Sequence, residues 1–199
     1  MPLEAPLVPV TERVTDLNRR YAHHSAADVL EHALSDPQVG NAALVSSFGA
    51  ESVVLLHMVS VIDRTTPVLF VDTEMLFPET LEYQREVAER LRLTNVQVIH
   101  PDRTQVFLRD PNSRLHASDA NACCALRKTE PLTNALEPYE AWITGRKRYQ
   151  GGRRAALDSF EADDGNRIKI NPLAHWETAN IKEYSLNNRL PRHPEVAKG

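Results

Sequence analysis

The sequence has few cysteines and no long apolar run, and both shortages exclude classes of protein. Its two cysteines are neighbours, and a disulfide between them would strain a peptide bond that stays planar and trans. Two cysteines without a secretory context are typical of the reducing cytoplasm. The first residues contain no basic stretch followed by an apolar run, so no signal peptide is visible, and no stretch could span a bilayer. We therefore expect a cytoplasmic protein without a membrane partner.

Positive charge is not in excess either. The chain carries 23 Lys and Arg against 27 Asp and Glu, a formal net charge of −4, which argues against a general nucleic-acid-binding protein. No internal repeat or low-complexity segment is present. The hydrophobic share of 42% and the charged share of 25% are ordinary for a globular protein. A length of 199 residues allows one α/β domain with a proper core, or two very small domains.

Residues 1–40 are predicted to form a helical segment ahead of the rest of the chain. Residues 1–10 contain three prolines and are expected to form a loose arm. One or two helices should follow within residues 11–34, with Ser25 as an N-cap and Asp28 at the capping-box position. Three histidines of this segment are expected to be surface residues rather than metal ligands: His23, His24 and His32.

From about residue 41 onward, short apolar runs alternate with helical stretches. Strands are expected at 42–47, 67–71, 96–100, 141–144 and 167–170, and helices at 53–62, from Pro78 onward, and around 178–187. Residues 101–122 should form a loop with one short helix, and the helical stretch through Leu136 should be interrupted at Pro131. Strand, helix and strand at this spacing predict right-handed βαβ units. The expected fold class is α/β, with a mainly parallel twisted sheet and flanking helices over 41–199, and the whole chain is expected to form a single compact domain.

Polar or glycine-containing segments follow three of the predicted strands. The loop 48–52 breaks the first strand ahead of a buried helix, a layout that points backbone N–H groups at an anion, although an ordinary turn between strand and helix would look the same. The second strand ends in Asp72-Thr73-Glu74, where a ligand crevice would lie. After the fourth strand, five of the nine residues in 146–154 are basic. Such a run is usually a solvated face, but its position at a strand end favours an anion site.

Cys123 and Cys124 lie in a segment with its own chemistry. Two adjacent thiolates suit iron or zinc, because these metals favour soft sulfur ligands. The basic residues Arg127 and Lys128 follow within a helical turn, and cationic neighbours lower thiol pKa values and offset the charge of a thiolate-bound cluster. The alternative is two buried thiols that act as small hydrophobic groups.

Together these segments resemble the assimilatory sulfonucleotide reductases, within the adenine-nucleotide α-hydrolase-like (PP-loop) superfamily. The motifs occur in one order and with consistent gaps over roughly residues 40–199. They are a modified pyrophosphate loop at Ser46–Ser52, a nucleotide loop at Val71–Thr80, the cysteine pair with its basic residues at Cys123–Lys128, a basic substrate loop at Ile143–Gln150, and two further motifs at Asn171–Leu173 and Leu190–Pro194. The resemblance implies a nucleotide-binding domain of that fold over 41–199.

The resemblance also implies an oxidoreductase of sulfate assimilation and cysteine biosynthesis. Members with the double cysteine are similar in using adenosine 5′-phosphosulfate and in carrying a four-iron, four-sulfur (4Fe-4S) cluster, so Cys123 and Cys124 would be two of its ligands. In the implied reaction a cysteine thiolate attacks the sulfate sulfur and AMP leaves. Thioredoxin then attacks the S-sulfocysteine and releases sulfite.

The matching motifs imply roles for individual residues. Lys128 is implied as a catalytic cation, because its charge would stabilise the reacting sulfate and the leaving phosphate. Substrate-binding roles are implied for Ser46, Ser47, Gly49, Glu51, Leu69, Asp72, Thr73, Arg127, Gly145, Arg146, Arg148 and Gln150. The implied partners are adenosine 5′-phosphosulfate or AMP and thioredoxin, and the sequence neither requires nor excludes a homo-oligomer.

The sequence departs from the family pattern at its end. The pattern continues beyond Gly199 with a Cys-x-x-Cys pair that completes the cluster, and then with a terminal Glu-Cys-Gly that carries the nucleophile. Neither is present, so only two of the four cluster ligands and no nucleophilic cysteine can be assigned. Because the sequence stops just before the missing motif, we expect a truncated chain or a fragment.

Two other hypotheses stay open. One is an ATP-pyrophosphatase-type ligase or sulfurtransferase of the same fold, whose loop typically reads Ser-Gly-Gly-x-Asp-Ser; here Phe48-Gly-Ala-Glu-Ser52 has one glycine fewer. The other is a non-catalytic nucleotide-binding or dimerisation module. Nucleotide preference would separate the first from a reductase, and sulfite release would separate the second.

Overall fold

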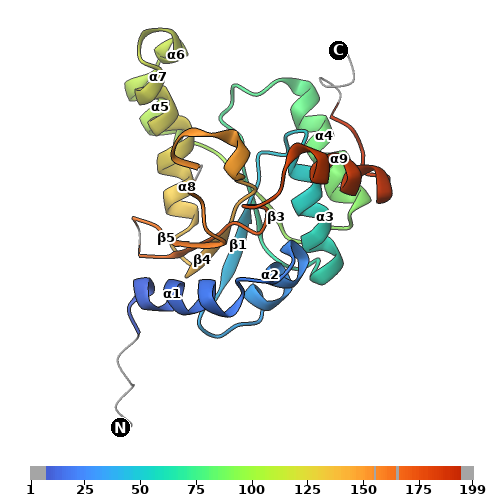
Figure 1. The fold of residues 1–199 in the computed structure, drawn as a ribbon. Coiled ribbons are helices and arrows are strands. Elements are labelled where there is room, and N and C mark those ends of the chain that lie inside the picture. Colours follow the sequence, from blue (N-terminus) through green and yellow to red (C-terminus); the bar gives the residue numbers. More distant parts are fainter. Residues whose placement is uncertain (1–7, 155, 165, 194–199) are drawn as a thin grey trace.

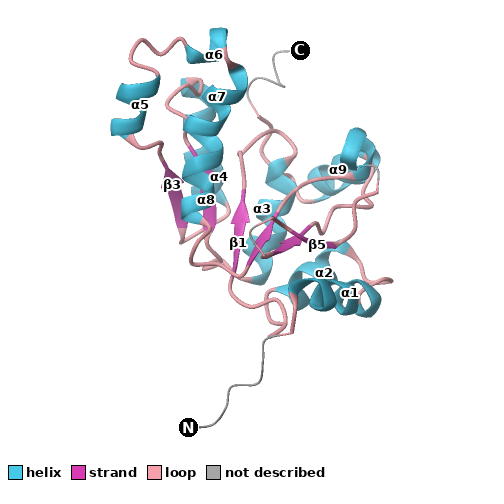
Figure 2. Cartoon of the chain, turned by 90° about the vertical axis from the view of Figure 1, so that its left-hand side faces the viewer, coloured by secondary structure: helices cyan, strands magenta, loops and turns pink. Residues whose placement is uncertain are grey.

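The computed structural model describes residues 8–154, 156–164 and 166–193. A six-stranded sheet runs through the described part, in the order β3-β2-β1-β4-β6-β5 (Figures 1 and 2). The strands are β1 Ala42–Val45, β2 Val68–Val71, β3 Val96–Ile99, β4 Ala141–Ile143, β5 Phe160–Ala162 and β6 Ile168–Ile170. Neighbouring strands are parallel except β5, which pairs antiparallel with β6. The prediction of an α/β fold with a mainly parallel sheet is therefore confirmed.

Helices connect and cover these strands. They are α1 Val10–Arg20, α2 Ala26–Ala33, α3 Ser52–Ile62, α4 Pro78–Arg90, α5 Arg103–Arg109, α6 Leu115–Ser118, α7 Ala120–Cys124, α8 Glu130–Ala135 and α9 Thr178–Asn187. A π-helical turn at Ala125–Thr129 joins α7 to α8, and short 3₁₀ turns lie at Arg148–Gln150 and Gly152–Arg154. Helices α5, α6 and α7 stand together at one end of the molecule, beyond α8 (Figures 1 and 2).

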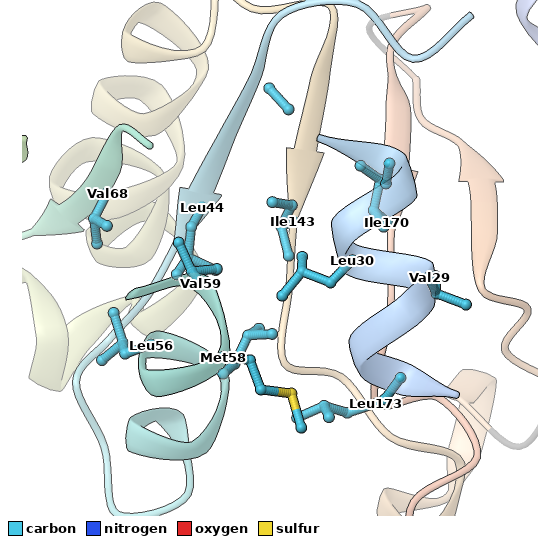
Figure 3. Packing of buried hydrophobic residues seen from close by; sticks show 14 of the residues in the cluster. Val29, Leu30, Leu44, Leu56, Met58, Val59, Val68, Ile143, Ile170 and Leu173 are labelled. Atoms are coloured by element: carbon cyan, nitrogen blue, oxygen red, sulfur yellow. The ribbon is translucent and has the colours of Figure 1, made fainter. Parts of the chain in front are cut away.

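Each face of the sheet has its own core, because successive strand residues point to opposite sides. On one face, Leu44 of β1 packs with residues of α1 to α4 and α9, and Figure 3 shows it beside Val59 of α3. On the other face, Ala43, Leu69 and Leu136 form a smaller cluster, with further side chains from α8 packed against it. Both faces of the sheet are covered, as parallel sheets require.

The N-terminal segment folds as α1 and α2 against the larger core. Asn18 of α1 pairs with β5 through its side chain: its amide donates to the Phe160 carbonyl (2.8 Å) and its oxygen accepts from the Phe160 N–H (3.0 Å). Ser25 and Asp28 form the predicted capping box. Residues 1–7 of the predicted arm lie outside the described residues. The histidines predicted at the surface are exposed: His23, His24 and His32.

The region before the cysteines is more helical than predicted. Instead of one short helix, residues 101–122 contain α5, α6 and the start of α7. Asp102 and Asp119 cap α5 and α7, since their carboxylates accept from the N–H groups of Gln105 and Ala122 (2.9 Å each). These caps offset the low helix propensity of a polar segment.

Two other details correct the sequence prediction. Strand β5 was not predicted, because three residues reading Phe-Glu-Ala carry too little alternation to stand out. Pro131 does not interrupt the helical stretch. It lies just after the π-turn Ala125–Thr129, and the chain stays helical on both sides of it.

The strand order reverses at the centre of the sheet. From β1 the sheet extends through β2 and β3 on one side and through β4 and β6 on the other. In such sheets the connections leave in opposite directions at the reversal, so a crevice opens beyond the carboxyl ends of β1 and β4. Among the helices of the described residues, none has the length and apolar character needed to cross a membrane.

Candidate active site

A hollow of about 390 Å³ lies at the carboxyl ends of β1 and β4. Two loops form it, residues 46–51 after β1 and residues 144–150 after β4. It brings together a large part of the predicted substrate-binding set: Ser46, Ser47, Gly49, Glu51, Gly145, Arg146 and Gln150. The loops come from distant parts of the chain and meet only because β1 and β4 pair.

The first loop is anchored by a buried phenylalanine. Phe48 adopts a left-handed backbone conformation with φ of 51°, which is unusual for a bulky residue. Its ring is fully buried and packs edge-on against Phe70, with 5.4 Å between ring centroids. The buried Ser46 hydroxyl accepts a hydrogen bond from the Phe48 N–H (3.1 Å). This anchor fixes the path of the loop between β1 and the N-terminus of α3.

The two glycines of the hollow are not required by the packing of the chain itself. Neither Gly49 nor Gly145 has a left-handed φ. A Cβ atom at Gly49 would lie 3.5 Å from the Ser47 hydroxyl, and one at Gly145 would lie 3.8 Å from the Leu55 side chain, which are ordinary contact distances. The absent side chains therefore leave backbone open for close approach by a ligand.

A charged clamp joins the two loops across the hollow. The Lys147 ammonium, whose side chain is only 3% exposed, donates to Glu51 Oε2 at 2.8 Å. The Tyr149 hydroxyl lies 2.8 Å from both carboxylate oxygens of Glu51. We call these three residues the Glu51 clamp. Because Glu51 directly precedes α3, the clamp fixes the N-terminus of this helix relative to the second loop.

The clamp sets the ionisation of its own members. Partial burial raises the pKa of Glu51, but hydrogen bonds from Lys147 and Tyr149 and the charge of Lys147 together outweigh it, so the pKa lies below its usual value. Burial and the hydrogen bond to Glu51 raise the pKa of Tyr149. Near neutral pH the clamp is therefore an ionised carboxylate held by an ammonium and a neutral phenol.

The other basic side chains of the second loop are paired as well. Arg146 Nη1 lies 3.1 Å from a carboxylate oxygen of Glu161 on β5. Arg148 donates through Nε to the Leu157 carbonyl (2.6 Å) and approaches Asp158 at 3.3 Å. Three cations of the predicted basic run therefore face carboxylates already: Arg146, Lys147 and Arg148.

Gln150 acts within this loop through its side-chain oxygen. That oxygen accepts from the Lys147 N–H (3.2 Å) and from the Arg154 guanidinium (2.6 Å). Gln150 thus fixes the turn that carries the buried ammonium. The side chain of Arg153, also part of the predicted basic run, lies outside the described part of the structure.

The predicted nucleotide loop begins at the end of β2, next to β1. The Asp72 carboxylate accepts from the Glu74 N–H (2.8 Å) and lies 3.9 Å from a ring nitrogen of His100, which follows β3. The Thr73 carbonyl accepts from Arg127 at 3.2 Å. Leu69 lies in the core of the sheet with 0% exposure, so its side chain cannot face a ligand in this structure.

The cysteine segment presents two different thiols. Cys123 is buried and Cys124 is exposed, and both are free. Lys128 is exposed in the π-turn that follows, and its side chain forms no hydrogen bond or ion pair with the described residues. Arg127 is buried against Asp110, so the expectation that it binds the substrate directly stays a prediction.

The residues present do not by themselves fit a 4Fe-4S cluster. Such a cluster takes four thiolates, and this chain has two cysteines. The described residues hold no group of three or more His, Cys, Asp or Glu that could bind a metal ion. The cluster implied by the resemblance therefore stays a prediction.

Three contributors to the site were not assigned from the sequence. Lys147 stood in the basic run, but its burial and its partner Glu51 could not be read from local pattern. Tyr149 lies in the predicted basic substrate loop Ile143–Gln150 but was given no role, and Asp110 carried no motif signal. Their partners lie far away in the sequence, so only the fold brings them together.

Comparison with known proteins identifies relatives over almost the whole chain. The sequence profile of the phosphoadenosine phosphosulfate reductase domain matches residues 41–199. A protein of Chelativorans sp. (strain BNC1) named adenosine 5′-phosphosulfate reductase is 48% identical over 185 residues, which cover 92% of this chain and 75% of that protein.

Solved structures give the same result. A phosphoadenylyl-sulfate reductase from Candida auris, in a phosphate complex, superimposes with a TM-score of 0.80 and 26% identity, over 100% of this chain and 94% of that one. The NMN synthetase of Francisella tularensis matches in fold alone, with a TM-score of 0.58 and 16% identity over 92% of this chain and 72% of that chain. The expected PP-loop fold is confirmed.

We expect Glu51→Gln to lower the free energy of unfolding at neutral pH by about 1–3 kcal/mol, because the Lys147 ammonium, which is almost fully buried, loses its carboxylate partner. The pKa of Glu51 is lower in the folded state than in the unfolded state. Its contribution is therefore full above the usual carboxylate pKa of about 4.3 and is lost as the pH falls through the folded-state value. Denaturant unfolding of both proteins across this range measures the difference.

Glu130→Gln is the matched control, since it breaks an exposed ion pair with Arg109 away from the hollow. A stability difference for Glu51→Gln that does not change with pH would contradict the role of the carboxylate.

Proposed function

The chain belongs to the phosphoadenosine phosphosulfate reductase family, and from this premise we propose that it binds adenosine 5′-phosphosulfate for thioredoxin-dependent reduction to sulfite and AMP. One observation carries the proposal. The hollow at the strand reversal combines two open glycines, the N-terminus of an 11-residue helix and a set of basic side chains. Backbone N–H groups at a helix N-terminus favour anions, and ligands of open α/β sheets bind at such reversals.

The anionic end of the nucleotide is proposed to lie in the hollow. Ser46, Ser47 and Gly49 line it on one side and Gly145 on the other, so the backbone of both loops can approach phosphate and sulfate oxygens. The adenosine end is proposed to extend over β2 towards Asp72 and Thr73. Leu69 can contribute only main-chain atoms, because its side chain is in the core.

The polar side chains of the two loops are proposed to have different roles in binding. Arg146 and its partner Glu161 are both half-buried, and we propose that Arg146 exchanges this carboxylate for a substrate oxygen. Arg148 and Gln150 shape the second loop through their hydrogen bonds to main-chain groups. Glu51 holds Lys147 in place at the base of the loop.

The proposed reaction needs a thiolate and a reductant. A cysteine thiolate attacks the sulfate sulfur, the bond from sulfur to the bridging oxygen breaks, and AMP leaves with the electron pair. A thioredoxin thiolate then attacks the cysteine sulfur, sulfite leaves, and the second thioredoxin thiol reduces the mixed disulfide. We propose that the nucleophile comes from outside these 199 residues, and that the Lys128 ammonium, which has no partner among the described residues, stabilises the developing phosphate charge.

We propose that Cys123 and Cys124 supply two of four thiolates to an iron–sulfur cluster, the others coming from outside these residues. Cys124→Ser should then remove most of the bound iron from an iron-loaded preparation, measured by iron and sulfide analysis. Ser118→Ala, a change at an exposed position of the neighbouring helix, is the control. Full iron retention in both Cys123→Ser and Cys124→Ser would rule out the ligand assignment.

Gly49→Ala and Gly145→Ala should each weaken AMP binding by roughly tenfold, because the added methyl group occupies the space through which the ligand would approach the main chain of the loop. Stability should change little, since the chain itself leaves room for either Cβ atom. Isothermal titration calorimetry measures binding, and thermal unfolding checks the fold. Two well-folded variants with wild-type affinity would place the nucleotide elsewhere.

The 199-residue chain should bind adenosine 5′-phosphosulfate and AMP but release no sulfite with thioredoxin and its reductase, because no nucleophile is assigned within it. Lys128→Ala should reduce the preference for adenosine 5′-phosphosulfate over AMP while leaving AMP affinity unchanged. Calorimetry and a sulfite assay measure these quantities.

Tighter binding of ATP than of either nucleotide would favour the ligase or sulfurtransferase alternative. Sulfite above the control without enzyme would make Cys123 or Cys124 the nucleophile and overturn their assignment to a cluster.

A further inference from the structure

A buried ion pair links the turn after α5 to the cysteine segment. The side chains of Asp110 and Arg127 are only 2% and 3% exposed. Arg127 donates through Nε and Nη2 to one carboxylate oxygen of Asp110, at 3.2 and 2.8 Å. The other oxygen accepts from the Leu115 N–H at the start of α6 (2.9 Å). Asp110 therefore uses both oxygens to hold neighbouring elements together.

The remaining nitrogen of the guanidinium reaches the nucleotide loop. Arg127 Nη1 donates to the Thr73 carbonyl at 3.2 Å. The next residue, Glu74, has a left-handed φ of 60°, and its N–H is bonded to Asp72. The loop thus leaves β2 through a tight turn, and Arg127 holds the carbonyl at its centre. This contact joins segments that are more than fifty positions apart in the sequence.

The π-turn explains why Arg127 can make these contacts. The turn covers Ala125–Thr129, directly after Cys123 and Cys124. Within this turn Arg127 is buried and Lys128 is exposed, because successive helical residues point in different directions. The same short helical stretch therefore presents one cation to the nucleotide loop and another to the surface.

We propose that Asp110 is a positioning residue for the nucleotide, which acts by orienting Arg127 so that its guanidinium fixes the Thr73 carbonyl and the loop around it. The charge of Arg127 is balanced by Asp110 and is not offered to the substrate. The identity of the ligand rests on the proposed function. The arrangement also couples the cysteine segment to the nucleotide loop, because the guanidinium that holds the loop belongs to the turn after the cysteines.

The alternative is that Arg127 binds the substrate through its charge, and the two roles predict opposite effects of Asp110→Asn. If Arg127 binds the anion directly, loss of the competing carboxylate frees its charge, and AMP binding should tighten. If Asp110 positions the loop, its loss releases the guanidinium from its orientation, and AMP binding should weaken. Arg127→Lys separates the roles again, because it keeps the charge but cannot span Asp110 and Thr73 together.

The test is calorimetric titration of the wild type, Asp110→Asn and Arg127→Lys with AMP and with pyrophosphate. We expect roughly tenfold weaker AMP binding in both variants. Pyrophosphate affinity should change by less than about twofold, since pyrophosphate lacks the adenosine that the nucleotide loop contacts. A general loss of stability would instead weaken the binding of AMP and of pyrophosphate together. Arg109→Gln is the matched control, because it removes the exposed pair next to Asp110 without touching Thr73.

The outcomes separate this inference from the proposed function. A wild-type protein that binds no AMP would overturn both. A wild-type protein that binds AMP, with equal affinity in both variants, would overturn the positioning role alone. Tighter AMP binding in Asp110→Asn would assign Arg127 to the substrate instead. If Asp110→Asn does not fold, Arg127→Lys decides, because it keeps a positive charge opposite Asp110.

Discussion

The parallel pairing of β1 with β4 is the constraint on which the site depends. Their register places Leu44 beside Ile143, and both side chains are buried in the larger core. This packing fixes where each strand ends, and thus where the loops 46–51 and 144–150 begin. A shift of register by one residue would turn these side chains to the other face of the sheet. It would also separate the two halves of the hollow, so the apolar core determines the geometry of the polar site.

Two cations that line the hollow are paired with carboxylates before any ligand arrives. The ammonium of Lys147 is held by Glu51, and the guanidinium of Arg146 by Glu161. A buried cation without a partner would be costly, so these carboxylates let an acidic protein keep cations in the hollow proposed as its ligand site. An anion that binds to either of these two cations must replace a carboxylate, and otherwise it can use backbone donors between the pairs. Both demands favour a ligand with several oxygens in a fixed arrangement over a single small ion.

The sequence predicted what depends on local pattern and missed what depends on distant partners. The apolar runs located five of the strands, and the polar loops after β1, β2 and β4 were placed correctly at one edge of the sheet. Burial of Leu69 could have been read from its position inside an apolar run. The π-turn that contains Arg127 has no local sequence signature. The role of Asp110 could not be predicted either, because it depends on the buried ion pair with Arg127. Contacts between side chains that are distant in the sequence could therefore not be predicted from the sequence.

The contact between Asn18 and β5 has a consequence for how the sheet can grow. Strand β5 ends the described sheet on one side, and an edge strand exposes unpaired N–H and C=O groups that can recruit another chain. The Asn18 amide takes the place of a neighbouring strand by bonding both main-chain groups of Phe160. Helix α1 thus blocks the pairing of a further strand with Phe160 at this edge. If two copies of the sheet joined edge to edge, we would expect them to pair through β3, the edge strand on the opposite side.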